Sequence, residues 1–190
     1  MRILLIDCYA ASHLDAHVVD SAIRSLGGRG HEIDHLALSA DEPTVFMSAD
    51  ERLAYETSSA LVAEDTKASA DRVKRADALL FCYPTTMLGV PPRLKAWLER
   101  VMVPGVAFVF DDKRRVRRAL RNIRRIGVIT TSPHSNTETM RARDLGRRTL
   151  LRALRLNCHT RCKTTFLRLP AAMLQAHTPA KIEKRFVGWR

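Results

Sequence analysis

Three groups of polar residues follow three apolar runs of the chain. Ser12 and His13 come after the run 2–7, Thr85 and Thr86 after the run 78–82, and the group Thr130–His134 ends the run 126–131. Runs of this length and composition are typical of buried parallel strands. In open α/β sheets, ligands bind in the crevice outside the carboxyl ends of such strands. The loops that follow these runs, residues 8–13, 84–90 and 131–137, are therefore the candidate ligand-binding loops.

A zinc-protease pattern also occurs in the chain, at His31-Glu32-Ile33-Asp34-His35. That chemistry needs a helix, which brings the two histidines together on one metal ion. Here a glycine-rich turn precedes the pattern and the apolar residues stop soon after it, which favours a strand. Histidines four residues apart on a strand lie about 13 Å apart, too far for one zinc ion. We therefore predict a strand and no metal site here.

The cysteines favour a reduced protein. Cys8 and Cys82 lie in apolar strand patterns, where a free thiol is a small buried hydrophobe. Cys158, His159 and Cys162 lack a second ligand pair with zinc spacing, so we expect a structural role for them. The first residues resemble a strand more than a signal peptide, and no apolar run reaches the ~20 residues that a membrane span needs. We expect a cytoplasmic protein without a membrane span.

Strands and helices alternate along the chain and would position the three loops. Strands are predicted over residues 2–7, 31–38, 78–82, 126–131 and 160–167. Helices are predicted from Ser12 to about residue 26, then over 63–75, 91–102 and 137–156, and from Thr178 onward. This alternation is typical of an α/β protein with a parallel sheet, and 190 residues suit one domain, 1–190.

Two local signals are especially strong. Pro91-Pro92 opens a helix, because proline suits the first helical turn. Its apolar residues follow a helical spacing and predict one face packed on the sheet: Leu94, Trp97, Leu98, Val101 and Met102. Ser48 followed by Glu51 predicts a capping box at the start of a short helix.

The region 83–108 resembles the signature of the flavodoxin-like NAD(P)H:quinone oxidoreductase family. The matching residues are Pro84, Leu94-Lys95-Ala96-Trp97, Glu99-Arg100-Val101 and Gly105-Val106-Ala107-Phe108. The chain departs from the family where Thr86-Met87 replace a pair of aromatic residues. The resemblance implies a flavodoxin-like three-layer sandwich with a five-stranded parallel sheet of order 2-1-3-4-5.

The same resemblance implies a cofactor and an activity. FMN or FAD would be reduced by NAD(P)H and would pass two electrons to a quinone or similar acceptor. The flavin would be bound by Ser12, His13, Leu14, Pro84, Thr85, Thr86, Met87, Thr130, Thr131, Ser132 and Pro133. His134 is the candidate proton donor or charge partner of the reduced flavin. Family members commonly pair, so a homodimer is expected.

Charged residues are distributed unevenly along the chain, and this distribution supports an alternative function. Residues 1–90 hold 8 Lys and Arg against 14 Asp and Glu, whereas residues 91–190 hold 24 against 6. The densest basic run, 113–125, is interpreted as a solvated face. It contains no aromatic residue for stacking on bases, so no specific nucleic-acid partner is expected.

The alternative is a flavodoxin-like module with weak or no flavin binding. Such a module would act as an anion-binding or regulatory protein through its basic C-terminal half. The residues that would then matter are Lys95, Arg114, Arg115, Arg118 and Arg121.

Overall fold

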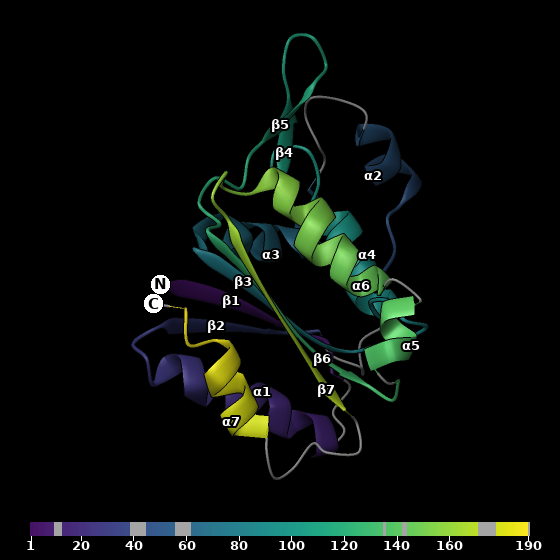
Figure 1. Cartoon of the computed structure of the whole chain (residues 1–190). Helices are drawn as coiled ribbons and strands as arrows, with labels where there is room; N and C mark the ends of the chain where they lie inside the picture. Colours follow the sequence, from purple (N-terminus) through teal and green to yellow (C-terminus); the bar gives the residue numbers. More distant parts are fainter. Residues whose placement is uncertain are drawn as a thin grey trace.

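The computed structural model describes residues 1–9, 13–38, 45–55, 62–134, 136–141, 144–170 and 178–189 (Figure 1). Its centre is a sheet of five parallel strands: β1 (Arg2–Asp7), β2 (Glu32–Ala37), β3 (Ala78–Pro84), β6 (Arg125–Ser132) and β7 (Lys163–Pro170). The strand order is β2-β1-β3-β6-β7, which confirms the expected order 2-1-3-4-5. The inner strands β1, β3 and β6 are buried almost throughout, as their continuous apolar runs require.

Helices cover both faces of this sheet and give the expected three layers (Figure 1). Helices α1 (His13–Gly27) and α7 (Thr178–Arg185) pack on one face. The other face holds α3 (Glu64–Arg75), α4 (Pro92–Val101) and the helical segment α6 (Leu145–Arg148), η1 (Thr149–Ala153) and η2 (Leu154–Asn157). Side chains of the central strands alternate between two apolar cores, with Leu4 and Ile6 in one and Ile3 and Leu5 in the other.

Helix α4 forms as its sequence predicts. Pro91 is the residue before the helix and Pro92 is its first residue. Leu94, Trp97, Leu98, Val101 and Met102 are all buried against the sheet side. The capping box is confirmed as well, because the side chains of Ser48 and Glu51 each accept a hydrogen bond from the other residue's backbone N–H at the start of α2 (Ala49–Ala54).

Three boundaries differ from the sequence prediction. Strand β3 continues to Pro84, because Tyr83 and Pro84 pair in register with Thr130 and Thr131. The helix expected over 137–156 is divided: α5 (Asn136–Arg141) is separate, and the later part passes from α-helical through π-helical to 3-10 geometry. The last strand begins at Lys163 and not near residue 160, because the Cys162 N–H closes a turn onto the His159 carbonyl.

A small hairpin was not predicted. Strands β4 (Phe108–Phe110) and β5 (Val116–Arg118) pair antiparallel and extend from one end of the molecule (Figure 1). The hairpin carries the first part of the basic run, and Asp111 accepts hydrogen bonds from the Lys113 and Arg115 N–H groups at its tip. Alternation over three residues is too short to distinguish such a strand from a loop.

The zinc-protease pattern lies on a strand, as predicted. Residues 32–37 form β2, and the two histidines have different partners. The His31 ring contacts the Trp189 carbonyl oxygen at 2.8 Å, whereas the His35 ring lies 3.1 Å from an Asp7 carboxylate oxygen. Within the described residues, no helix is long and apolar enough to cross a membrane.

Candidate functional site

The carboxyl ends of β1, β3 and β6 lie side by side. Asp7 is in register with Cys82, and Pro84 with Thr131. Two further backbone bonds continue beyond the strands: the Cys8 N–H donates to the Cys82 carbonyl, and the Thr85 N–H to the Thr131 carbonyl, both at 2.8 Å. The described parts of the three predicted loops therefore meet at one edge of the sheet. Open α/β proteins bind their ligands outside this edge of the sheet.

Two threonine hydroxyls connect the ends of β3 and β6. The Thr85 and Thr130 hydroxyl oxygens lie 2.7 Å apart, so one donates to the other. Thr130 and Ser132 are buried, whereas Pro133 and His134 are exposed. The Ser132 hydroxyl accepts the His134 N–H at 3.1 Å, which holds the backbone at the point where the chain leaves β6.

A strained turn projects from the end of β3. Thr86 and Gly89 exchange two backbone hydrogen bonds, so Met87 and Leu88 form the two central residues of a tight turn. Both have positive φ angles, 48° and 58°, which fits the mirror-image turn that normally uses Asn and Gly. Non-glycine residues in such conformations cluster at ligand sites, where neighbouring structure holds them in place. Met87 is 91% exposed on this turn.

Helix α6 braces the strained turn. The Leu145 N–H donates to the Leu88 carbonyl at 3.0 Å. Gly146 lies so close to the turn that a Cβ atom there would be 3.4 Å from backbone atoms of Gly89 and Val90. The same Cβ would lie 2.6 Å from the Tyr83 hydroxyl, so no larger residue fits without a shift. The turn and α6 are therefore one packed unit.

An ion pair lies behind this unit. Asp144 and Arg168 approach to 2.5 Å, and both side chains are 14% exposed. Arg168 also donates to the Thr139 hydroxyl and stacks on the Phe166 ring. Burial raises the pKa of the Tyr83 phenol well above its ordinary value; the Asp144 carboxylate adds to this increase and Arg168 opposes it. Tyr83 is thus a neutral hydroxyl at working pH.

The two cysteines at the strand ends are not nucleophiles. Burial raises the pKa of Cys8 to about 11, although a hydrogen bond from the Leu94 backbone and the charge of Arg93 oppose the shift. Burial also raises the pKa of Cys82, and the Asp7 carboxylate adds to that effect. Since the thiolate is the reactive form, the site offers no thiol chemistry.

The structure brings together most of the residues predicted to form the site. Pro84, Thr85, Thr86, Met87, Thr130, Thr131, Ser132, Pro133 and His134 all lie at the ends of β3 and β6 or directly after them. Ser12 lies outside the described residues. His13 and Leu14 begin α1, but their side chains are also outside the description.

Three residues of this region were not singled out from the sequence. Asp7 accepts the Tyr9 N–H at 2.9 Å and contacts His35, so it fixes the exit of β1. Asp144 and Arg168 are the other two, and they come from segments 24 residues apart. An acid ending an apolar strand was a usable signal for Asp7. Nothing local indicated the ion pair, because only the tertiary fold brings α6 onto β7.

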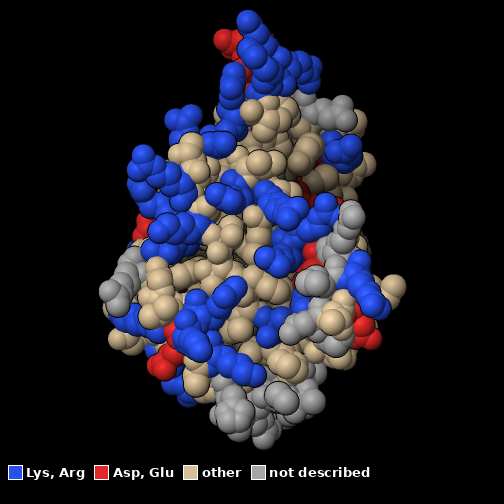
Figure 2. Space-filling model, viewed as in Figure 1, with Lys and Arg blue, Asp and Glu red and all other residues tan. Residues whose placement is uncertain are grey.

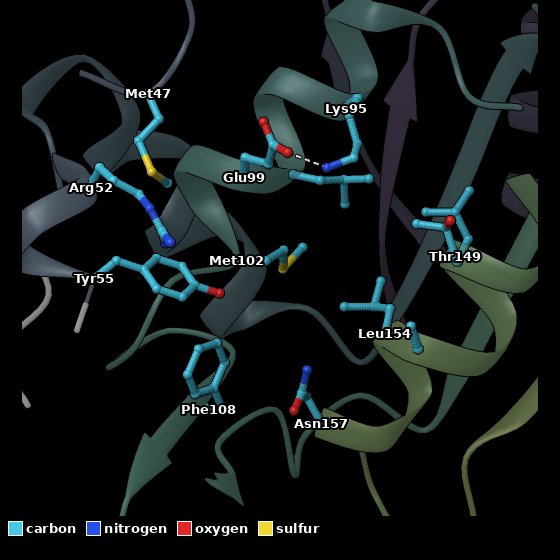
Figure 3. A pocket seen from close by; sticks show the side chains of 13 residues that line it. Met47, Arg52, Tyr55, Lys95, Glu99, Met102, Phe108, Thr149, Leu154 and Asn157 are labelled. Carbon is cyan, nitrogen blue, oxygen red and sulfur yellow. Dashed lines mark hydrogen bonds and ion pairs between the residues drawn. The ribbon is translucent and has the colours of Figure 1, made fainter. Parts of the chain in front are cut away.

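A separate cavity lies between α2, α4, β4 and the η1–η2 segment (Figure 3). Its volume is about 610 Å³, and none of its lining residues belongs to the three loops. Met102 and Phe108 line its apolar part, and the Tyr55 and Phe108 ring centroids are 5.8 Å apart in an edge-to-face arrangement. Lys95 and Glu99 form an ion pair on its α4 side.

Comparison with known proteins points to one family and fold. The family model described as "Flavodoxin-like fold" matches residues 1–168. NAD(P)H dehydrogenase [quinone] 1 of Cavia porcellus is 30% identical over an alignment that covers 48% of this chain and 38% of that protein. The chain thus matches less than half of the length of this relative.

Two solved structures show the same fold at low sequence identity. NAD(P)H:quinone oxidoreductase from Methanothermobacter marburgensis is 18% identical with a TM-score of 0.75, covering 97% of this chain and 95% of that one. An FMN-dependent NADH-azoreductase from Bacillus anthracis, in complex with FMN, is 14% identical with a TM-score of 0.67, covering 96% and 94%.

Proposed function

We infer the function from the family: the chain belongs to the flavodoxin-like fold family, and we propose that it is a flavin-dependent NAD(P)H oxidoreductase. It would pass two electrons from NADH or NADPH to a quinone or a similar acceptor. The observation that carries this proposal is the meeting of the β1, β3 and β6 ends at one edge of the sheet, where hydroxyls and a histidine lie. The relatives' names agree with it, since they include quinone oxidoreductases and an FMN-dependent azoreductase.

The residues present fit a flavin. The exposed Thr86 and Met87 lie on a strained turn that α6 holds in place, and Met87 offers a polarizable sulfur to a flat ring. Thr131, Ser132 and Pro133 border the same edge of the sheet. A bound flavin supplies the hydride and electron chemistry, and FMN is the form that a structural neighbour contains.

The chain's own residues would orient the ring and adjust the charge around it. The Thr85 and Thr130 hydroxyls bond to each other and hold the ends of β3 and β6 together. His134, exposed directly after β6, is proposed to hold a proton or a positive charge beside the reduced cofactor. No thiol takes part, because Cys8 and Cys82 remain protonated.

We also propose that the protein is a homodimer. Helix α4 turns its apolar residues inward, so it provides no apolar surface patch for pairing. Large apolar side chains are instead exposed near α2 and on the hairpin: Val45, Phe46, Leu53, Val109 and Val116. A second copy would cover these side chains. All four cysteines are free and buried, which supports the proposed cytoplasmic location.

Titration of FMN into the purified protein tests the proposal. Saturable quenching of flavin fluorescence is expected, with weakened affinity because two aromatic partners are missing. Aromatic packing contributes about 0.5–1.5 kcal/mol, so Thr86→Trp should tighten binding by roughly two- to tenfold. Val187→Trp, which adds the same side chain at an exposed valine beyond α7, should leave affinity unchanged. Absence of saturation at hundreds of micromolar FMN or FAD, roughly −5 kcal/mol of binding, would exclude the oxidoreductase.

A further inference from the structure

A second cavity runs along the edge of the sheet, between the helical segment 144–155 and strand β7. Its volume is about 770 Å³. Five arginines and one aspartate line it: Arg147, Arg148, Arg152, Arg155, Arg168 and Asp144. We call it the arginine groove. Figure 2 shows that lysine and arginine side chains dominate the charged surface on this face of the molecule.

Most of these arginines are not neutralised. Asp144 is the acid of the groove, and it is already engaged by Arg168 and by the Arg147 N–H. Among the described residues, no carboxylate lies within 4.0 Å of Arg148, Arg152 or Arg155. Like charges four residues apart destabilise a helix, so Arg148 and Arg152 oppose the fold that holds them. The groove therefore presents a concentrated positive charge that suits a multiply charged anion.

Phosphate groups suit the groove better than carboxylates do. Arg presents a planar fork that binds phosphate oxygens in pairs, and several forks along one wall fit a ligand with several phosphates. The arginines follow from Arg148 to Arg155 along about 10 Å of helix. This length matches a nucleotide, and the volume lies within the range of small-molecule sites, about 300–1,000 Å³.

The groove begins next to the candidate flavin site. Asp144 lines the groove, while its neighbours Leu145 and Gly146 contact the turn at residues 86–89. Thr139, on the helix that follows the β6 exit loop, lines the same end. A nicotinamide ring placed over a flavin at the strand ends could therefore extend its adenosine half into the groove.

We propose that the arginine groove binds the 2′-phosphate and diphosphate of NADPH and makes the protein prefer NADPH to NADH. This inference rests on the proposed function, because it specifies that reaction's electron donor. The 2′-phosphate carries close to two negative charges at neutral pH, and arginine is the residue that accommodates it in other dinucleotide sites. NADH lacks this group and would leave the arginines without their strongest partner.

A nucleic acid fits the same face less well. Single-stranded binding sites use aromatic rings on which bases stack. Phe166 is the aromatic residue of the groove, and its ring already has the guanidinium groups of Arg147 and Arg168 at 5.3 and 5.4 Å from its centroid. The groove thus offers charge without a free stacking surface.

Calorimetric titration with 2′,5′-ADP and with 5′-AMP tests the inference without any flavin. The 2′,5′-ADP should bind at least about tenfold more tightly than 5′-AMP, a difference of about 1.4 kcal/mol. The variant Arg148→Gln/Arg152→Gln/Arg155→Gln should weaken 2′,5′-ADP by about tenfold or more. The matched variant Lys113→Gln/Arg115→Gln/Arg117→Gln removes the same charge from the hairpin and should change affinity less than about twofold.

Steady-state kinetics of the flavin-loaded protein with NADPH and NADH provide a second test of the inference. The groove variant should raise KM for NADPH more than KM for NADH, because only NADPH carries the 2′-phosphate, and kcat should stay similar for both donors. If the triple variant fails to fold, Arg152→Gln alone should show the same direction of change.

Three results would overturn the inference. They are equal affinity for 2′,5′-ADP and 5′-AMP, equal weakening by both triple variants, and displacement of 2′,5′-ADP by short duplex DNA at about 0.15 M salt. If 2′,5′-ADP fails to bind while FMN saturates, the groove is wrong and the oxidoreductase stands. If FMN fails to bind while 2′,5′-ADP binds as expected, the oxidoreductase proposal is wrong and the groove remains a phosphate-binding site.

Discussion

At the scale of single residues, Gly146 allows α6 to approach the strained turn closely, because it has no Cβ atom. A Cβ at this position would lie 2.6 Å from the Tyr83 hydroxyl, so Gly146→Ala forces a shift. We expect it to lower the free energy of unfolding by about 1–3 kcal/mol and to weaken FMN binding. Denaturant titration and flavin quenching measure the two effects.

Two variants test whether the Tyr83 hydroxyl is the group that a Cβ at residue 146 would meet. Gly188→Ala places its Cβ where nothing lies within 4 Å, so stability should stay within about 0.5 kcal/mol of the natural chain. Tyr83→Phe combined with Gly146→Ala removes the hydroxyl that the new Cβ would meet, and most of the lost stability should return. An unchanged loss in the double variant would show that Tyr83 is not the obstacle.

Met87 tests whether the turn stores strain. Its φ of 48° is unfavourable for a methionine, while Asn tolerates this conformation. Because the side chain is 91% exposed, Met87→Asn loses little packing and should raise the free energy of unfolding by about 1 kcal/mol. Met87→Gln keeps the length without the conformational preference and should give no gain. Equal stability of both variants in urea would contradict a strained turn.

At the scale of elements, three helices meet through one buried arginine. Arg100 of α4 contacts Glu51 of α2 at 2.9 Å and both carboxylate oxygens of Asp65 on α3 at 2.8 Å. Arg100 and Glu51 are only 8% and 7% exposed, so neither charge is free in solvent. The contacts hold α2 against α3 and α4.

The pKa values of these acids predict acid sensitivity. The Arg100 hydrogen bond lowers the pKa of Asp65 below its ordinary 3.8 despite some burial. Burial alone would raise the pKa of Glu51, but the Ser48 N–H and Arg100 outweigh it and lower the pKa below 4.5. A lowered folded-state pKa contributes stability that is present above the ordinary value and is lost as pH falls through the folded value. Stability should therefore fall as the pH decreases below about 4.5.

Asp65→Asn makes that expectation measurable. The variant should be less stable than the natural chain at neutral pH. Between pH 5 and 2 its free energy of unfolding should fall less steeply, because one carboxylate with a lowered pKa is missing. Asp71→Asn changes an exposed acid of the same helix and should leave the slope close to that of the natural chain. Parallel urea curves for all three proteins across this range would contradict the coupling.

At the scale of the whole molecule, the apolar side chains exposed near α2 and on the hairpin predict assembly into a dimer. A stable pair needs roughly 1,000 Å² or more of buried surface, and α2 with the hairpin offers several apolar side chains. We expect light scattering to give twice the chain mass of 21.4 kDa. Val109→Asp should produce monomers, whereas Val187→Asp, at a similarly exposed valine beyond α7, should not. A single-chain mass for the natural protein at micromolar concentration would exclude the dimer.

Much of the fold was determined locally by the sequence. The inner strands could be recognised because their runs are apolar without alternation, and α4 because two prolines open a helix whose apolar residues share one face. The region around residues 83–108 also carried the family resemblance. The loops could be placed at one edge because parallel strands in the order 2-1-3-4-5 must bring their carboxyl ends together.

The tertiary structure decided what depends on contacts between distant segments. The Asp144–Arg168 pair and the close packing of Gly146 on Tyr83 exist only because α6 lies between the β3 turn and β7. The basic run 113–125 looked like the main charged feature, yet Arg115 and Arg117 pair with Asp111 on the hairpin. Among the described residues, Arg148, Arg152 and Arg155 of the groove have no acid within ion-pair distance. Pairing depends on which acids the fold brings close, and the spacing of residues in the sequence does not give that distance.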